Sequence, residues 1–179
     1  MQPTKQHRET ASDLDRKFRR DQHVAVLVSE SDENTHARWY ARVLTALTIT
    51  AAGEEIIWAQ MQFRDEGTGE VFFTVLTAQA VILGHATGVK GDSPKVDDVR
   101  AIGRKALALV EVKASTAIDE NSSSAHAWPG DVQIYTEYLV PEKQGKQVVL
   151  FVAYEKQSNQ ETEHPLLRLL AELQKDLNS

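Results

Sequence analysis

The feature that most constrains this chain is a repeated alternation of apolar and polar residues between short turn-like segments. After the glycine-containing stretch 51–55, Ile57, Ala59, Met61 and Phe63 occupy every second position. A period of two places such residues on one face of a β-strand. Similar patterns predict seven strands, over residues 39–50, 57–64, 71–77, 81–85, 106–113, 132–140 and 148–154. Because several turns between them are short, we expect mainly antiparallel pairing.

Two segments have a helical period instead. Pro165 suits the first turn of a helix, and Leu166, Leu170, Leu173 and Leu177 follow at spacings of four, three and four. This pattern predicts an amphipathic helix at the C-terminal end. Ala11, Leu14 and Phe18 predict a second helix over about 11–20, with Ser12 near its start. Its apolar stripe is narrow, so we expect weak docking and expect the residues up to Asp21 to be removable without unfolding.

Length and charge predict an N-terminal arm followed by one domain. The chain has 179 residues, and six basic against four acidic residues make the first 23 mildly basic. Residues 24–179 are acidic and are predicted to form a single β-rich domain that ends in the amphipathic helix. An acidic body disfavours nucleic-acid binding. Since no apolar run approaches the ~20 residues of a membrane span, and no apolar leader is present, we expect a cytoplasmic protein without a membrane partner.

The sequence carries no linear motif for catalysis, a metal or a cofactor. The chain has no cysteine, and no two of its six histidines have the three- or four-residue spacing of a helical metal pair. Paired carboxylates such as Asp97-Asp98 lie in turn-like segments, where solvated side chains are the rule. We expect His85, at the end of a strand pattern, to be a structural residue. These observations predict no catalytic residue, no metal site and no cofactor.

Aromatic residues supply the candidate binding residues. Trp128 lies beside Pro129 in the long segment 115–130, with His126 two residues before it. Trp58 shares its strand parity with the polar residues Gln60 and Gln62. An exposed tryptophan offers a large contact area to a partner. We therefore take Trp128, His126 and Trp58 as the candidate binding residues.

The order of these elements resembles the pleckstrin-homology-like (PH-like) superfold, including its small bacterial members. A four-strand meander, three further strands and one closing helix run from Trp39 to Leu177, and the stretch 73–84, FTVLTAQAVILG, corresponds to the third and fourth strands. The resemblance implies a seven-stranded antiparallel split barrel or sandwich capped by the C-terminal helix. A calycin-like barrel or a cone-shaped α+β fold of the nuclear-transport-factor-like kind presents similar strands and stays open as an alternative.

The resemblance also directs the functional prediction, because family members bind phosphoinositides, peptides or proteins and few are catalysts. Phosphoinositide-binding members use basic residues around the first hairpin loop, whereas the corresponding segment 51–55 here is acidic. We therefore predict a non-catalytic module that binds a protein or a peptide. The alternatives are a small-molecule-binding or enzymatic half-open barrel, and a structural subunit of a larger assembly. Homo-oligomerisation is left open.

Overall fold

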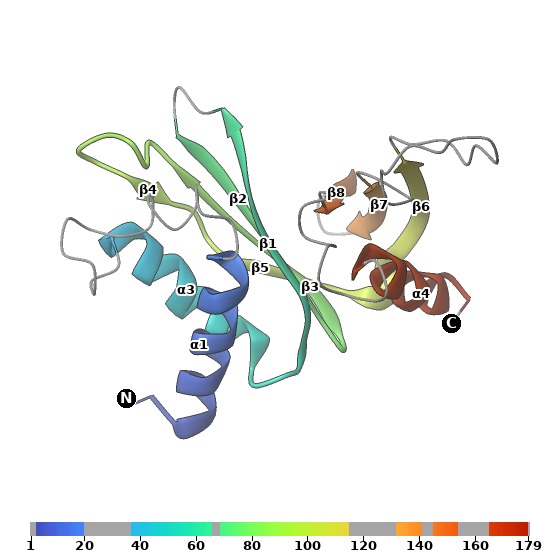
Figure 1. The fold of residues 1–179 in the computed structure, drawn as a ribbon, viewed down its shortest axis with the longest axis horizontal. Coiled ribbons are helices and arrows are strands. Elements are labelled where there is room, and N and C mark those ends of the chain that lie inside the picture. The colour runs from blue at the N-terminus through green and yellow to red at the C-terminus, as the bar shows by residue number, and fades with distance from the viewer. Residues whose placement is uncertain are drawn as a thin grey trace, which may run out of the picture. The chain divides into compact units, whose positions relative to one another are not determined.

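The computed structural model describes residues 3–19, 37–65, 69–114, 132–140, 145–153 and 165–178. The chain divides into two compact units, Met1–Gly103 and Arg104–Ser179, and each is described by itself. The elements (Figure 1) are α1 (Lys5–Phe18), α3 (Arg38–Ala51), β1 (Ile56–Asp65), β2 (Glu70–Thr77), β3 (Ala80–Thr87), β4 (Lys95–Val96), β5 (Arg100–Gly103), the 3-10 turn η1 (Arg104–Ala106), β6 (Leu107–Ala114), β7 (Val132–Val140), β8 (Gly145–Ala153) and α4 (Pro165–Leu177).

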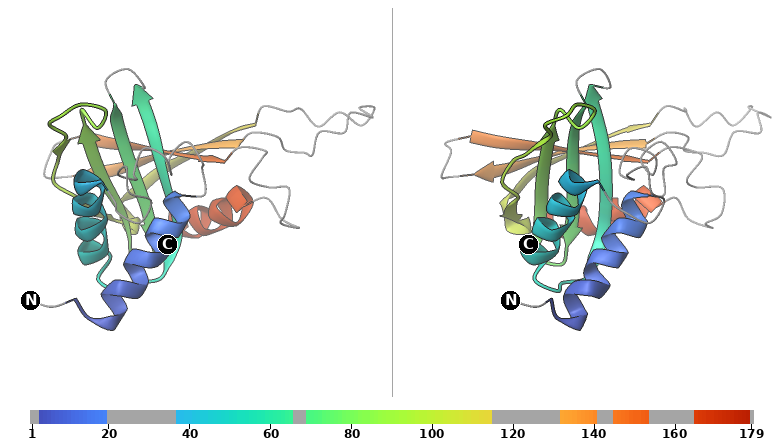
Figure 2. Two further views of the ribbon diagram at one scale, coloured as in Figure 1. Left: turned by 60° about the vertical axis from the view of Figure 1, so that its left-hand side comes forward. Right: turned by 90° about the vertical axis from the view of Figure 1, so that its left-hand side faces the viewer.

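The first unit is built on an antiparallel meander. β1 pairs with β2 and β2 with β3, while β4 and β5 both pair with β3 along its other edge. The tight turn between β2 and β3 is held by Thr77, whose hydroxyl donates to the Ala80 carbonyl at 3.1 Å and accepts from the Ala80 N–H at 3.0 Å. This side-chain hydrogen bonding is typical of threonine in turns. The meander thus presents two faces, one of which α1 and α3 cover (Figure 2).

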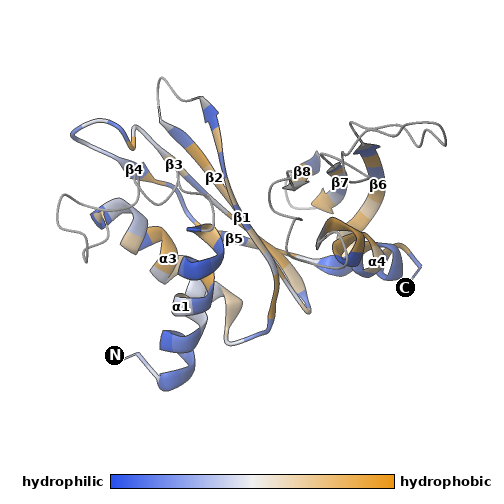
Figure 3. Ribbon diagram, viewed as in Figure 1, coloured by the Kyte–Doolittle hydropathy of each residue, from blue (hydrophilic) through white to orange (hydrophobic). Residues whose placement is uncertain are grey.

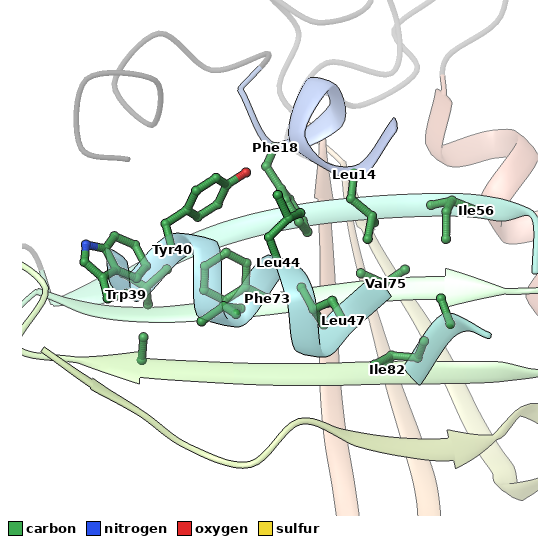
Figure 4. Close-up of a cluster of buried hydrophobic side chains, with 14 residues drawn as sticks. Leu14, Phe18, Trp39, Tyr40, Leu44, Leu47, Ile56, Phe73, Val75 and Ile82 are labelled. Atoms are coloured by element: carbon green, nitrogen blue, oxygen red, sulfur yellow. The ribbon is translucent and has the colours of Figure 1, made fainter. Parts of the chain in front are cut away.

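Phe73 lies at the centre of the covered face (Figure 4). The Phe18 ring of α1 meets it edge-on with centroids 5.3 Å apart, and the rings of Trp39 and Tyr40 lie within 6.4 Å and 6.3 Å. Leu47 packs in the same cluster and is fully buried. Edge-to-face and tilted aromatic pairs add to the free energy gained by burying the rings. Two helices and the sheet therefore share one core.

The predicted first strand, 39–50, is wrong, because these residues form helix α3. Trp39, Val43 and Leu47 fit a spacing of four as well as a spacing of two, and the structure buries them on one helical face. The period of two was therefore not unique to a strand. In the helix, the hydroxyls of Thr45, Thr48 and Thr50 each donate to the carbonyl four residues earlier at 2.8 Å, which satisfies them locally.

The N-terminal helix is longer than predicted and does not dock weakly. α1 begins after Thr4, whose side chain accepts from the His7 N–H while the His7 ring accepts from the Thr4 N–H, so the cap lies eight residues before Ser12. Leu14 and Phe18 are buried in the shared core. The Tyr40 hydroxyl also donates to Asp15 at 2.9 Å, and burial raises the pKa of this tyrosine. The helix is an integral part of the first unit.

The second unit is a three-stranded antiparallel sheet, in the order β6-β7-β8, with α4 packed on one face. The C-terminal helix is confirmed, with Leu166, Leu169 and Leu173 buried. The spacing predicted that Leu170 and Leu177 would be buried. Leu169 is buried in place of Leu170, and Leu177 is exposed. From the sheet, four buried side chains face this helix or lie in the same core: Ile134, Tyr138, Val149 and Phe151. α4 is therefore amphipathic, with a buried apolar side and a solvated polar side, and its ribbon carries both hydropathy colours (Figure 3).

An ion pair joins the beginning of the second unit to its end. The Arg104 guanidinium, nearly buried, donates from Nε to Asp176 at 2.7 Å and from a terminal nitrogen to the Glu172 carbonyl at 3.3 Å. Burial alone would lower the pKa of Arg104, but the hydrogen bond and charge of Asp176 outweigh it and raise the pKa. A buried guanidinium needs such partners, because an uncompensated charge costs several kcal/mol, about 3–5 when one partner is removed.

The described chain is therefore an α+β protein of antiparallel sheets, as predicted. Its described strands form two sheets and no closed barrel, so the seven-stranded split barrel or sandwich is not confirmed in detail. Six predicted strands are present as β1, β2, β3, β6, β7 and β8, and the short β4 and β5 were not predicted. The predicted domain boundary, between residues 23 and 24, lies outside the described residues. The division between the compact units falls instead after Gly103, and α1 belongs to the first of them.

We expect Phe18→Ala to lower the free energy of unfolding by about 3–5 kcal/mol, because it leaves a cavity beside Phe73. Ser12→Ala on the exposed side of the same helix is the control and should change it by no more than about 0.5 kcal/mol. Urea unfolding followed by circular dichroism measures both. Equal stability of the two variants would show that α1 can be dispensed with, as its sequence pattern suggested.

We also expect stability to fall at alkaline pH through two buried tyrosines. The Tyr138 hydroxyl has no hydrogen-bond partner among the described residues, and burial raises its pKa, as it does for Tyr40. Because the folded state holds the neutral phenol, this stabilisation is complete below a pH of about 10 and is lost above it. Tyr138→Phe should leave stability at pH 7 unchanged or raised and should weaken the alkaline loss.

Tyr40→Phe is the contrasting variant, because it removes a hydrogen bond that is made. It should cost about 1 kcal/mol at pH 7 and weaken the alkaline loss as well. Urea midpoints measured between pH 7 and 11 give both quantities. A Tyr138→Phe variant as sensitive to alkali as the unchanged protein would contradict the assignment.

Candidate functional site

Of the three predicted binding residues, Trp58 is the one that lies among the described residues. Trp128 and His126 lie outside the described residues. Trp58 lies in β1, on the sheet face that α1 and α3 do not cover, and the register pairs it with Leu76 of β2. Its indole N–H donates to the Gln60 side chain at 3.1 Å, and it is partly buried. Trp58 is thus tied to its own strand, and the prediction for the other two residues stays a prediction.

A cluster around His85 occupies the same face of the first sheet. The register places His85 of β3 opposite Phe72 of β2, and the two rings stack with centroids 4.5 Å apart and an angle of 21° between their planes. The Arg64 guanidinium lies 5.9 Å from the centroid of the Phe72 ring. Two carboxylates flank the imidazole: Asp97 lies 2.5 Å from Nδ1 and Glu70 lies 3.1 Å from Nε2. The imidazole is therefore contacted on one face by Phe72 and at its two nitrogens by Asp97 and Glu70.

This geometry makes His85 a clamp between chain segments. Two ionised carboxylates are both acceptors, so the imidazole satisfies them together only when both of its nitrogens carry a proton. The Asp97 N–H also donates to the His85 carbonyl at 3.0 Å. The segment after β4 is thereby attached to β3 by main chain and side chain. The expectation that His85 is structural agrees with these contacts.

The same contacts oppose a metal-binding or catalytic role for His85. Asp97 and Glu70 lie at opposite ring nitrogens, so the three groups do not converge on one point, and the described residues contain no cluster of three or more ligands that could hold a metal ion. A general base needs one ring nitrogen directed at a substrate or nucleophile. In His85, Asp97 contacts Nδ1 and Glu70 contacts Nε2, so both ring nitrogens already face a carboxylate.

A second surface stands out on the sheet of the second unit. The face away from α4, which we call the outer face, carries three large apolar side chains, Leu109, Leu139 and Val148, with exposed fractions of 37%, 51% and 54%. The register pairs Glu137 of β7 with both Leu109 and Val148, and Leu139 follows two residues later on the same side. We call these three residues the outer patch. They come from three strands, and Glu137 of the central strand lies between Leu109 and Val148 on the same face.

Charged and aromatic residues surround the outer patch. Lys146 pairs with Glu137 at 2.6 Å, and the Lys113 ammonium lies 4.8 Å from the centroid of the Tyr135 ring. Both charge signs are therefore present among and beside the apolar side chains. Antiparallel sheets with one packed face normally place polar residues on the other. Exposed leucine and valine therefore distinguish this face from the usual polar one.

Sequence reasoning missed the outer patch for a definable reason. The parities of β7 and β8 are visible in the sequence, but Val148 and Val149 are adjacent and equally apolar, so alternation does not say which is buried. The irregular register between Leu107 and Leu109 likewise changes the parity inside β6. Only the observed pairing shows that Leu109, Leu139 and Val148 share the solvated face.

Other features of the first unit offer little to a ligand. A shallow depression is lined by Lys5, Arg8, Glu9, Ser12, Asp13 and Arg16, all from α1. Small-molecule sites are concave and mostly apolar, whereas these residues are charged and lie along one helix. No described helix is both long and apolar enough to cross a membrane.

Comparison of the chain with known protein families, with curated proteins and with solved structures gave no match. The functional argument therefore depends on the chemistry of the described residues.

We expect a double-mutant cycle between His85→Gln and Asp97→Asn to give a coupling of about 0.5–1 kcal/mol, the range of partly exposed ion pairs. The control cycle replaces Asp97→Asn with Asp13→Asn, on α1 across the sheet, and should be additive within about 0.5 kcal/mol. Urea unfolding of the four variants in each cycle supplies the values. Additive His85 and Asp97 effects would mean that the clamp does not stabilise the first unit.

Proposed function

We propose that this protein is a non-catalytic module that binds another protein through the outer patch of its second unit. The observation that carries the proposal is the meeting of Leu109, Leu139 and Val148 on one solvated sheet face. Apolar side chains at a face that is otherwise polar gain free energy when a partner removes them from water. Tyr135 and the Glu137–Lys146 pair beside them supply the polar border of such an interface.

The chemistry of the patch favours a protein partner over other classes. A pleated sheet face is broad and open, while small-molecule sites enclose most of their ligand. Nucleic acids and anionic lipids need concentrated positive charge, but here Lys113 and Lys146 stand beside Glu111 and Glu137. Apolar side chains with both charge signs among and beside them fit a protein surface of matching pattern.

The PH-like architecture is retained as part of the proposal. It is supported by the meander of β1–β3, by the three later strands and by the closing helix α4. It is weakened by α3, which stands where the resemblance expects the first strand. The predicted seven-stranded split barrel, the cytoplasmic location and the absence of catalysis belong to the same proposal, and the lack of cysteine is compatible with a reducing compartment.

We expect Leu139→Lys to remove partner binding without unfolding the protein, because Leu139 is half-exposed and a lysine there places a hydrated charge at the centre of the interface. Immobilised protein would be used to capture partners from the native host, followed by mass spectrometry. The partner would then be purified and titrated. Its affinity should fall at least about tenfold, or 1.4 kcal/mol.

The matched control is Ile49→Lys, which also replaces an exposed apolar residue with lysine but lies on α3 of the first unit. It should capture the same partner with unchanged affinity. If Leu139→Lys retains every partner of the unchanged protein, the outer patch is not the binding surface. A thermal-shift screen with small molecules tests the half-open-barrel alternative, which predicts a ligand whose effect survives Leu139→Lys.

A further inference from the structure

Among the described residues, strand β8 forms an edge of the second sheet that lacks the usual protection. Its nine residues pair with β7 without interruption, from Gly145 opposite Val140 to Ala153 opposite Val132. Among the described strands, β7 is its sole partner. The unpaired edge of a long, regular strand is a template for another strand, and proteins normally blunt such edges with bulges, prolines or charges.

The other edges of the two sheets carry such devices, and β8 does not. β1 has register irregularities near both of its ends and ends in Arg64 and Asp65. β6 has an irregularity after Leu107 and carries Glu111 and Lys113. β8 has no irregularity and no proline, and Lys146 is its one charged residue. The run 148–153 is uncharged and rich in β-branched residues, the composition of segments that pair with one another.

We propose that the occupant of this edge is β8 of a second copy of the chain, in an antiparallel, two-fold symmetric pair centred on Val149. This register uses all nine residues and sets Val149 opposite Val149 of the second copy. It also sets Val148 opposite position 150, and Lys146 opposite position 152. Because residues of equal parity meet, the two outer faces lie on the same side of one six-stranded sheet.

Charge placement favours self-pairing in this register. The charged residue of β8, Lys146, lies six positions from its symmetry mate, roughly 20 Å along the strands, which is beyond the screening length at physiological salt. No like charges therefore face each other, and the apolar run 148–153 is covered by its own copy. The pairing goes beyond the proposed function, since it uses the edge and not the face. It would also join two outer patches into one surface, a consequence that rests on the proposed function.

Sedimentation of the full chain tests the pairing. We expect a species of about 40 kDa, twice the 20.0 kDa of the chain, in equilibrium with monomer. Val148→Lys adds an edge lysine at a half-exposed position and should weaken the dimer at least about tenfold. Leu139→Lys, on the central strand, should leave the dimer constant within about threefold, even though it removes the proposed partner.

Site-directed cross-linking tests the register, and the absence of native cysteine makes single-cysteine variants selective. Residues diagonal across an antiparallel pair lie about 7–8 Å apart, so Val148→Cys should give a covalent dimer with a short bismaleimide. Leu139→Cys is equally exposed, but three strand spacings, about 14 Å or more, separate it from its mate, and it should not react in this way.

Three outcomes would overturn the pairing: a monomer at every concentration, a dimer insensitive to Val148→Lys, or equal cross-linking of the two cysteine variants. Hydrogen exchange adds a fourth, because edge amides protected in a monomer would mean that the chain itself covers β8. The proposed function fails on a different result, namely partner binding that survives Leu139→Lys. The two proposals can therefore fail separately.

Discussion

The burial of one face of each sheet under helices is the constraint on which the rest of this structure depends. In the first unit the constraint centres on Phe73, whose ring is contacted by aromatic rings from both α1 and α3. Rings of this size bury about 150–250 Å² each, so their removal from water supplies much of the stability of a small unit. This core holds the helices on the sheet, and the Tyr40–Asp15 hydrogen bond joins the two helices to each other.

In each unit, helices cover one face of the sheet. The two units differ in the side chains that their uncovered faces carry. The uncovered face of the first sheet carries polar side chains. Glu70 and Asp97 contact His85 there, and the Phe72 ring stacks on His85 with Arg64 near it. The second sheet leaves Leu109, Leu139 and Val148 in contact with solvent. A surface whose polar groups are already paired has little left for a ligand, whereas exposed apolar groups gain from a partner.

Sequence reasoning succeeded where one period alone fits the residues. The C-terminal helix was predictable because Leu166 to Leu177 fit no strand, and the strand over 132–140 because its alternation is uninterrupted. The segment 39–50 failed because Trp39, Val43 and Leu47 satisfy both periods, and only the surrounding core selects the helix. The His85 cluster could not be read from the sequence, because Glu70 and Asp97 come from different segments that the strand register brings together.

The small size of the second unit connects its stability to association. Three strands and one helix are close to the minimum for an independently stable sheet, and its core depends on a few side chains such as Tyr138, Phe151 and Leu173. Any partner that binds only the folded form adds stability in proportion to the logarithm of its concentration, about 2.7 kcal/mol at a hundred times its dissociation constant. Contacts at the β8 edge or the outer patch would therefore stabilise this unit, while the first unit, which buries two helices on its sheet, has less need of them. On the proposed function, burial of the apolar residues left exposed on the second sheet would add to the stability of this unit.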